Sequence, residues 1–266
     1  MRLLSYQGGF GRLAEEDGVA GLVPMGRDLV AYLAGREQPV DRDWVSLGDV
    51  TLTAPVPRPG KIICVGLNYR DHAAETGSAV PTEPVLFAKF ANSVTGDGAV
   101  VPIPPACQEV DWEAELGVII GSRASRVDVD GAMAHVAGYT CLNDLSARDL
   151  QRRGGQWTRG KAVDGFLPMG PWLVTPAEVG DPQQLAISCR VNGETVQRSS
   201  TAQMVFGVAE LISVISQTIT LEPGDCIATG TPPGVGMAMD PPRFLRPGDV
   251  VVVEVEKVGR LTTTMA

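Results

Sequence analysis

Acidic side chains at alternate positions of residues 109–120 are the first indication of chemistry in this sequence. Glu109, Asp111, Glu113 and Glu115 are separated by apolar residues. Because successive side chains of a β-strand point to opposite faces, the spacing predicts four acids on one face and a core on the other. Neighbouring carboxylates repel, and burial raises their pKa values unless a cation lies among them. A hard divalent ion held by oxygen atoms is the natural partner; a solvated strand face is the alternative interpretation.

The two histidines differ in their neighbours. His72 precedes Glu75 by three residues, so the two share one face of a helical turn. A carboxylate beside an imidazole orients the ring and raises its basicity, as a water-activating base requires. Surface helices also contain such pairs by chance. His135 lies among small and apolar residues in the segment 132–136, and we interpret it as structural.

Asp144 follows the apolar segment Tyr139–Leu142, which we expect to be a strand. A carboxylate at a strand end is placed to complete a metal site begun by Glu113 and Glu115. The alternative role for Asp144 is to cap a helix over residues 145–152.

Lys161 and the loop 230–236 are candidates for binding an anion. Lys161 lies in a glycine-bounded turn, from which it could reach a substrate oxyanion, although most lysines are solvated surface residues. The loop reads GTPPGVG and has no obvious helix after it, so it is a poor dinucleotide or phosphate-loop motif. Its hydroxyl and N–H groups suit a carboxylate instead.

Composition limits the class of protein. The 266 residues carry a net charge of −9 with a pI near 4.8, which argues against nucleic acid or an anionic membrane as partner. No apolar run approaches the ~20 residues that span a bilayer, and the first residues lack a signal-peptide pattern. The five cysteines are scattered without a CxxC motif, which favours reduced thiols in the cytoplasm over disulfides or a zinc site.

The order of expected elements predicts an α+β fold dominated by short antiparallel strands. We expect a small N-terminal domain at 1–54, a proline-rich linker at 55–60 and a main domain at 61–266. Expected strands cover 45–52, 61–67, 109–120 and 250–255, with a hairpin around Asn192-Gly193; expected helices cover 70–76, 128–136, 145–152 and a segment that Thr201 caps, with Met204 to Ile215 on its apolar face.

Six ordered segments between 61 and 264 resemble the fumarylacetoacetate hydrolase family in its shorter bacterial and mitochondrial form. They are VGLNYRDHAAE (65–75), DWEAELGVIIG (111–121), GYTCLNDLSARDLQ (138–151), GKAVDGFLPMGPWLVT (160–175), VNGETVQ (191–197) and GTPPGVG (230–236). The resemblance implies a mixed β-roll or β-sandwich catalytic domain, usually in a homodimer, around Mg²⁺ or Mn²⁺.

The resemblance also assigns roles to residues. Glu113, Glu115 and Asp144 are the implied metal ligands, and His72 with Glu75 is the implied water-activating pair on a lid segment. Lys161 is implied to stabilise an oxyanion, and Gln151 and Thr231 to contact substrate. Asp111 and Asp164 are expected around the ligands, with Arg148 bracing the site. Departures from the family pattern occur at Ala162, 199–203 and Thr263, and none removes an implied catalytic group.

The expected activity is divalent-metal-dependent hydrolysis of the C–C bond of an acylpyruvate, or of a related β-diketo acid, to pyruvate and a carboxylic acid. An oxaloacetate-type decarboxylase and a keto–enol isomerase are the alternatives on the same scaffold, because both need an enolate but no attacking water. A ureidoglycolate lyase ranks lower, since no residue selects a ureido group. A non-catalytic metal-binding relative is the alternative from another class.

Overall fold

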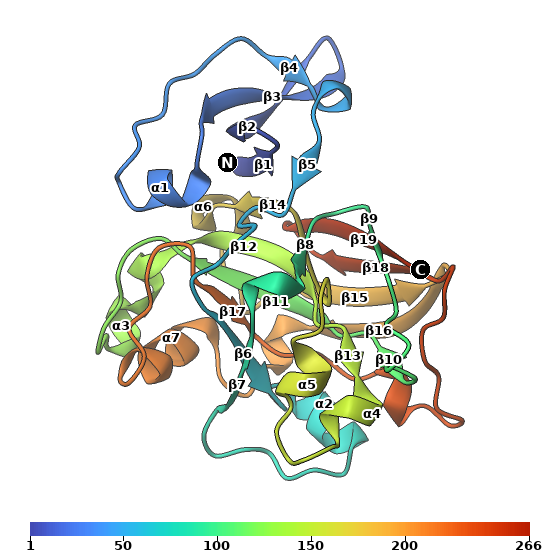
Figure 1. The fold of residues 1–266 in the computed structure, drawn as a ribbon. Helices are drawn as coiled ribbons and strands as arrows, with labels where there is room; N and C mark the ends of the chain where they lie inside the picture. The colour runs from blue at the N-terminus through green and yellow to red at the C-terminus, as the bar shows by residue number, and fades with distance from the viewer.

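The computed structural model describes all of residues 1–266, and its N-terminal strands stand apart from the main body in the ribbon (Figure 1). These strands form an antiparallel meander with one short helix. Its elements are β1 (Arg2–Tyr6), β2 (Gly9–Glu16), β3 (Val19–Gly26), α1 (Leu29–Leu33), β4 (Val45–Ser46), η1 (Leu47–Asp49) and β5 (Leu52–Thr53). The expected strand over 45–52 is interrupted by η1, because the Ser46 hydroxyl accepts the N–H of Gly48 and starts a turn.

The main sheet continues from these strands across the molecule. Its order is β4-β3-β2-β1-β14-β12-β11-β17-β6-β7, with β5 paired to β1 and β8 to β14. The further members are β6 (Ile62–Gly66), β7 (Val85–Lys89), β8 (Val94–Thr95), β11 (Ala114–Ile120), β12 (Val136–Asn143), β14 (Leu167–Val174) and β17 (Cys226–Ala228). Because β1 pairs with β14, one sheet contains strands from both sides of the expected linker. The division into domains at 1–54 and 61–266 therefore stays a prediction.

A second sheet packs near the first and gives the mixed, mostly antiparallel architecture that the sequence predicts. It has the order β16-β15-β18-β19-β9 and consists of β9 (Ala99–Val101), β15 (Ala186–Val191), β16 (Glu194–Ser200), β18 (Val250–Val255) and β19 (Gly259–Met265). One cluster of 40 buried apolar residues draws on both sheets. The expected hairpin is present, with Asn192 and Gly193 at φ values of 52° and 84°.

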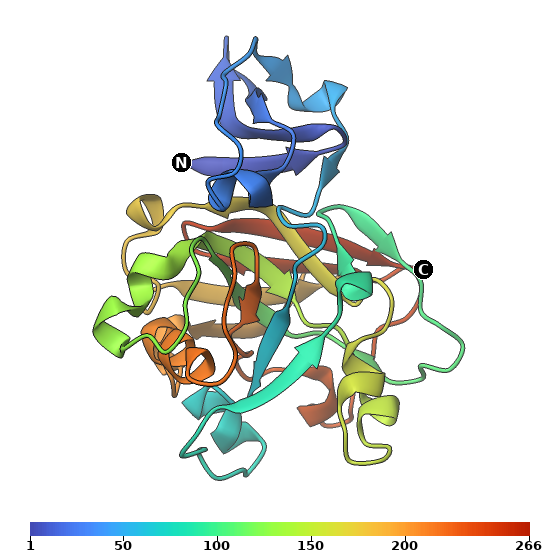
Figure 2. The same cartoon turned by 60° about the vertical axis from the view of Figure 1, so that its left-hand side comes forward.

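Helices are short and lie at the sheet margins. They are α2 (Arg70–Glu75), η2 (Ala91–Ser93), α3 (Val129–Ala132), η3 (Met133–His135), α4 (Arg148–Gln151), α5 (Thr158–Lys161), α6 (Pro176–Val179), η4 (Thr201–Gln203), α7 (Val208–Ser216) and η5 (Gly236–Ala238). In both ribbon views α2, α4 and α5 gather at the end of the main body remote from the N-terminal strands (Figures 1 and 2). No helix is long and apolar enough to cross a bilayer.

Three predicted helices are shorter than expected, because tertiary pairing takes over their ends. The helix over 128–136 consists of α3 and η3 and gives way to β12 at Val136. The helix over 145–152 is reduced to α4, since β13 (Ser146–Ala147) pairs with β10 (Val110–Asp111). Thr201 does not cap α7, because its hydroxyl accepts the Leu185 N–H; Gly207 precedes that helix instead.

The acidic segment is not one continuous strand, contrary to the prediction. It divides into β10 and β11 because side chains accept three successive backbone N–H groups. The Asp111 carboxylate accepts the N–H of Trp112, Asn143 that of Glu113, and Gln197 that of Ala114. Both faces of β11 are buried, and the alternate apolar residues from Val110 to Ile120 belong to the large core cluster.

Gly117 in the middle of β11 provides a test of this packing. A Cβ there would lie 2.8 Å from Leu142 Cγ and 2.9 Å from Thr140 Cγ2 on β12. We predict that Gly117→Ala destabilises the protein by ~1–3 kcal/mol through overpacking. Gly131→Ala is the matched control, because the added Cβ meets only Val127 Cγ1 at 3.6 Å. Chemical denaturation checks both; equal midpoints for the two variants would contradict the predicted crowding.

Candidate active site

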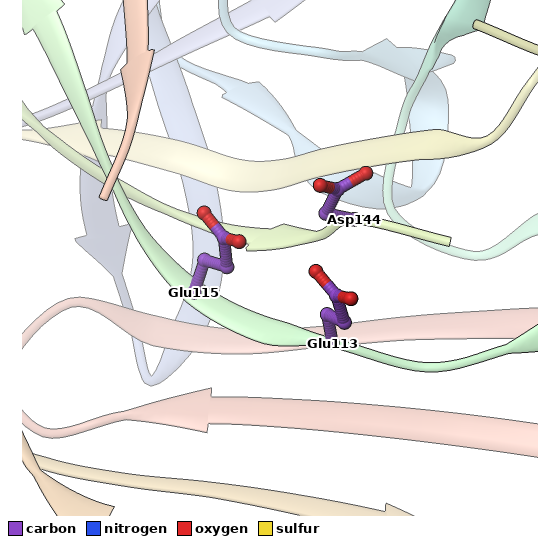
Figure 3. A group of neighbouring side chains, drawn as sticks. All are labelled: Glu113, Glu115 and Asp144. Carbon is purple, nitrogen blue, oxygen red and sulfur yellow. The ribbon is translucent and has the colours of Figure 1, made fainter. Parts of the chain in front are cut away.

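Three buried carboxylates converge where β11 begins and β12 ends. Glu113 directly precedes β11, Glu115 lies within it, and Asp144 directly follows β12. Antiparallel pairing sets Ala114 opposite Asn143, so these strand ends are adjacent, and the Asp144 N–H donates to the Glu113 carbonyl over 2.9 Å. One ligand oxygen from each carboxylate lies within 4.8 Å of the others. Figure 3 shows the three side chains pointing into a common space.

The other two acids of the segment lie elsewhere, which corrects the prediction of a single acidic face. Glu109 is half-buried and forms an ion pair with Arg152. Asp111 is buried but bonds to Arg148 Nε at 2.8 Å and to the N–H of Gly236 at 2.7 Å. The break between β10 and β11 therefore separates Asp111, which has a structural role, from the carboxylates of Glu113 and Glu115, which are placed to bind a metal ion.

Three buried cations surround the triad. Lys161 Nζ lies 2.8 Å from both Glu113 Oε2 and Asp144 Oδ2, and Arg148 Nη1 lies 2.7 Å from Glu113 Oε1. Lys89 Nζ lies 2.5 Å from Asp144 Oδ1. With Asp111 included, four buried carboxylates face three buried cations, which leaves an excess of one negative charge.

The carboxylates differ in how well they are compensated. Burial opposes ionisation of Glu113, but Lys161 and Arg148 outweigh it and lower its pKa to about 2. Burial raises the pKa of Glu115 well above its ordinary value, and repulsion from Asp144 and Glu113 adds to the rise. The Glu115 carboxylate accepts one N–H, from Gly230 at 2.9 Å, and forms no ion pair. Glu115 is thus the buried acid that lacks a cation.

This arrangement fits a divalent metal ion. Three carboxylates in one buried cluster offer the hard oxygen ligands that Mg²⁺ and Mn²⁺ prefer. An ion there would also supply the positive charge that Glu115 lacks. Glu113, Glu115 and Asp144 would hold it, as the sequence predicts, and both ions suit the same ligand set.

His72 and Glu75 form the expected pair on α2. His72 Nδ1 lies 2.8 Å from Glu75 Oε2, and Glu75 Oε1 accepts the Gly234 N–H at 2.8 Å. A carboxylate can only accept, so Nδ1 donates and Nε2 is left as the free nitrogen. Gly234 has φ +99°, and a Cβ there would lie 1.9 Å from the Val196 carbonyl oxygen, so the loop requires glycine at this point.

Side chains and backbone from two other segments hold α2 in place. Asn68 donates to the carbonyls of Phe206 and Thr229 and accepts the Phe206 N–H. Ser199 donates to Asp71 over 2.5 Å. The segment expected to order as a lid is therefore docked against 199–206 in this structure.

The loop 230–237 connects separate parts of the site through its backbone. Its N–H groups donate to three carboxylates: Gly230 to Glu115, Gly234 to Glu75, and Gly236 to Asp111. Within the loop, Thr231 donates to the Ala114 carbonyl and accepts an N–H from Gln197. The sequence predicts that this loop binds a carboxylate, and in the structure the carboxylates that it binds are those of Glu75, Asp111 and Glu115.

A small pocket of about 250 Å³ opens onto this machinery. It is lined by Val65, Gly66, Leu67, His72, Thr76, Ser78, Phe87, Glu113, Arg148, Gln151, Trp157, Lys161, Thr231 and Met237. The predicted substrate contacts Gln151 and Thr231 therefore both reach it, although Gln151 also accepts a bond from Arg148 at 3.0 Å. Phe87 and Trp157 meet edge to face and form an apolar wall.

Several expectations about individual residues need revision. Asp144 does not cap a helix, because its carboxylate oxygens bind two lysines. Asp164 is exposed and bonds to Asn92 at 2.6 Å, so it does not contact the triad. Lys89 was not among the sequence candidates. Its signal is a lone charge at the end of an otherwise apolar strand, as for Asp144 at the end of β12.

Comparison with known proteins agrees with this geometry. The family model for the C-terminal domain of fumarylacetoacetate (FAA) hydrolase matches residues 61–266, so the chain belongs to this family. Among curated proteins, a mitochondrial oxaloacetate tautomerase of Bos taurus is 54% identical over 213 residues, 79% of this chain and 68% of that protein. A putative hydrolase of Burkholderia cenocepacia is 44% identical and covers 97% of this chain and 96% of its own length.

Solved structures extend the likeness to the whole chain. A fumarylacetoacetate hydrolase of Exiguobacterium antarcticum superposes with a TM-score of 0.89 at 37% identity, covering 100% of this chain and 99% of its own. A 2-hydroxyhepta-2,4-diene-1,7-dioate isomerase of Mycobacterium marinum gives 0.85 at 33% identity, covering 100% and 98%. The predicted family and fold are confirmed, and the family contains enzymes named for different reactions.

Glu115 generates a prediction about metal and pH. Its pKa is raised in the metal-free protein, so the stability it contributes is present at low pH and lost as pH rises through that raised pKa. A saturating divalent ion should raise the melting temperature by about 5–10 °C at pH 8, and by less as the pH falls and a proton competes. Thermal unfolding in EDTA and in MnCl₂ across pH checks this.

The matched variant is Glu115→Gln, which keeps the shape and removes the charge. We expect it to be more stable than wild type in EDTA at pH 8, and to gain little from Mn²⁺. Identical melting temperatures for metal-free wild type and variant at every pH would show that Glu115 is not under electrostatic strain.

Proposed function

We propose that this protein is a divalent-metal-dependent enzyme that interconverts the keto and enol forms of oxaloacetate or of a closely similar 2-oxo dicarboxylic acid. One observation carries the proposal. An imidazole with one free nitrogen and a buried ammonium group line a small pocket together with Glu113 of the carboxylate triad, and the ammonium group also binds Asp144. Proton transfer beside a stabilised negative charge is what such a set of groups can perform. The tautomerase name of the 54%-identical relative supports this choice.

Charge balance favours an anionic substrate. With all four carboxylates ionised, the buried groups carry an excess of one negative charge, which a bound divalent ion would convert to an excess of one positive charge. A 2-oxo acid that gains negative charge as it enolises would then complement the site. When bound, the ion would act as a Lewis acid toward the substrate oxygens.

We assign the proton to His72 and the developing charge to Lys161. His72 Nε2 is free to accept a proton from the carbon between the two carbonyl groups and to pass it to the 2-oxo oxygen, or to carry it from that oxygen to the carbon in the reverse direction, while Glu75 fixes the ring. Lys161 Nζ, at the pocket wall, would stabilise the negative charge on the 2-oxo oxygen. Gln151 and Thr231 would contact the substrate from the same wall.

Hydrolysis of an acylpyruvate is the second candidate. The His72–Glu75 pair also suits activation of a water molecule, and the apolar wall of Phe87 and Trp157 could receive an acyl group. The product would be pyruvate with a carboxylic acid. Decarboxylation of oxaloacetate would use the same enolate without the pair.

One assay series separates these reactions. Enol oxaloacetate is dissolved with and without enzyme and Mg²⁺ or Mn²⁺, and the enol absorbance and the pyruvate released are followed together. Metal-dependent loss of enol without pyruvate is the expected result. Pyruvate from oxaloacetate would point to a decarboxylase, and pyruvate from acetylpyruvate to the hydrolase. No turnover of either compound would reject both candidate functions.

The proton-transfer role predicts the behaviour of His72→Asn. Loss of a positioned general base typically costs ~10²–10⁴ in rate, so kcat for enol–keto conversion should fall by that range. His135→Asn is the control, because His135 bonds to Ser122 at 2.9 Å, does not line the pocket and should leave kcat unchanged. Near-normal kcat in His72→Asn would remove His72 from the reaction.

A further inference from the structure

Lys89 is a buried charge for which the proposed reaction has no use. It ends β7, its side chain is 0% exposed, and it does not line the pocket. Its ammonium group lies 2.5 Å from Asp144 Oδ1 and 3.1 Å from the carbonyl oxygen of Leu145. Burying a lysine costs free energy, so a fully buried lysine is expected to have a structural or functional role that offsets this cost.

The two oxygens of Asp144 are bound by two different lysines. Lys161 Nζ bridges Asp144 Oδ2 and Glu113 Oε2, each at 2.8 Å, so these two oxygens face the same ammonium group and Asp144 Oδ2 is turned toward Glu113. Lys89 binds the other oxygen, Oδ1, and contacts no second carboxylate. Lys161 therefore lies between Glu113 and Asp144, while Lys89 binds Asp144 alone, through its other oxygen.

We propose that Lys89 is a positioning residue that fixes the Asp144 carboxylate with Oδ2 turned toward Glu113 before an ion binds. The inference rests on the proposed metal dependence and deepens it. An aspartate carboxylate rotates about its terminal bond over a broad range, so two oxygens can exchange unless one is held. A charge-assisted bond to Lys89, itself fixed by the Leu145 carbonyl, removes that freedom.

Lys161→Met is a matched control for Lys89→Met, because each variant removes one positive charge from the same aspartate. If charge alone mattered, both would bind a divalent cation more tightly than wild type. If Lys89 positions Asp144, Lys89→Met should weaken Mn²⁺ binding by ~10–100-fold, the usual effect of losing a group that orients a ligand. Lys161→Met, which removes a competing cation from the pocket side, should tighten it.

The experiment titrates Mn²⁺ into the three full-length proteins by isothermal calorimetry, with paramagnetic relaxation of water protons as a second readout. Loss of Asp144 as a ligand opens a place for water, so the relaxation enhancement of bound Mn²⁺ should rise in Lys89→Met. A structural defect elsewhere would lower the amount of folded protein without changing the hydration of bound Mn²⁺. Circular dichroism establishes that each variant is folded.

Lys89→Gln keeps an N–H donor on a shorter, neutral side chain and serves where Lys89→Met does not fold. We expect its Mn²⁺ affinity to fall below that of wild type, with the same rise in relaxation enhancement. Tighter binding than wild type by either Lys89 variant, or unchanged ion hydration, would overturn the positioning role alone. Failure of wild type to bind Mn²⁺ would overturn the proposed metal dependence and this inference with it.

Discussion

Mutual repulsion among Glu113, Glu115 and Asp144 is the constraint on which the rest of the site depends. Pairing of β11 with β12 brings these acids together, and burial removes the water that would separate their charges. Three cations from three different elements, Lys89, Arg148 and Lys161, pair with Glu113 and Asp144 and offset part of this negative charge. Because the compensation is short by one charge, the cluster is suited to an added cation.

Relatives of the same fold carry different reaction names, and the proposed function suggests a reason. In the proposed function the charge centre would stabilise an enolate and the His72–Glu75 pair would transfer a proton, and tautomerisation, decarboxylation and hydrolysis would use these two capacities to different extents. We expect the distinctions between them to arise at the pocket wall, which Gly66, Phe87 and Trp157 line. Identity of 54% with a named tautomerase and 37% with a named hydrolase is consistent with a shared centre and differing walls.

Local patterns in the sequence predicted the parts of the site that depend on short-range geometry. The His72–Glu75 spacing and the two-residue alternation of Glu113 and Glu115 follow from helix and strand periods. A local pattern marks Lys89 as a lone charge at the end of an apolar strand but does not reveal its partner, because Asp144 is 55 residues away in the sequence. The break at Trp112 was also hidden, since it requires Asn143 and Gln197 to replace ladder partners.

The loop 230–237 joins a metal-type ligand, the orienting acid of the imidazole and the partner of Arg148 through main-chain amides. All three donors are glycines at which an added Cβ would lie within 3 Å of a neighbouring atom, so the connections need these glycines as well as their amides. The length of the loop is equally constrained. A single inserted or deleted residue would shift the donors relative to all three acids at once, so we expect relatives to keep the three glycines and the residue count between them.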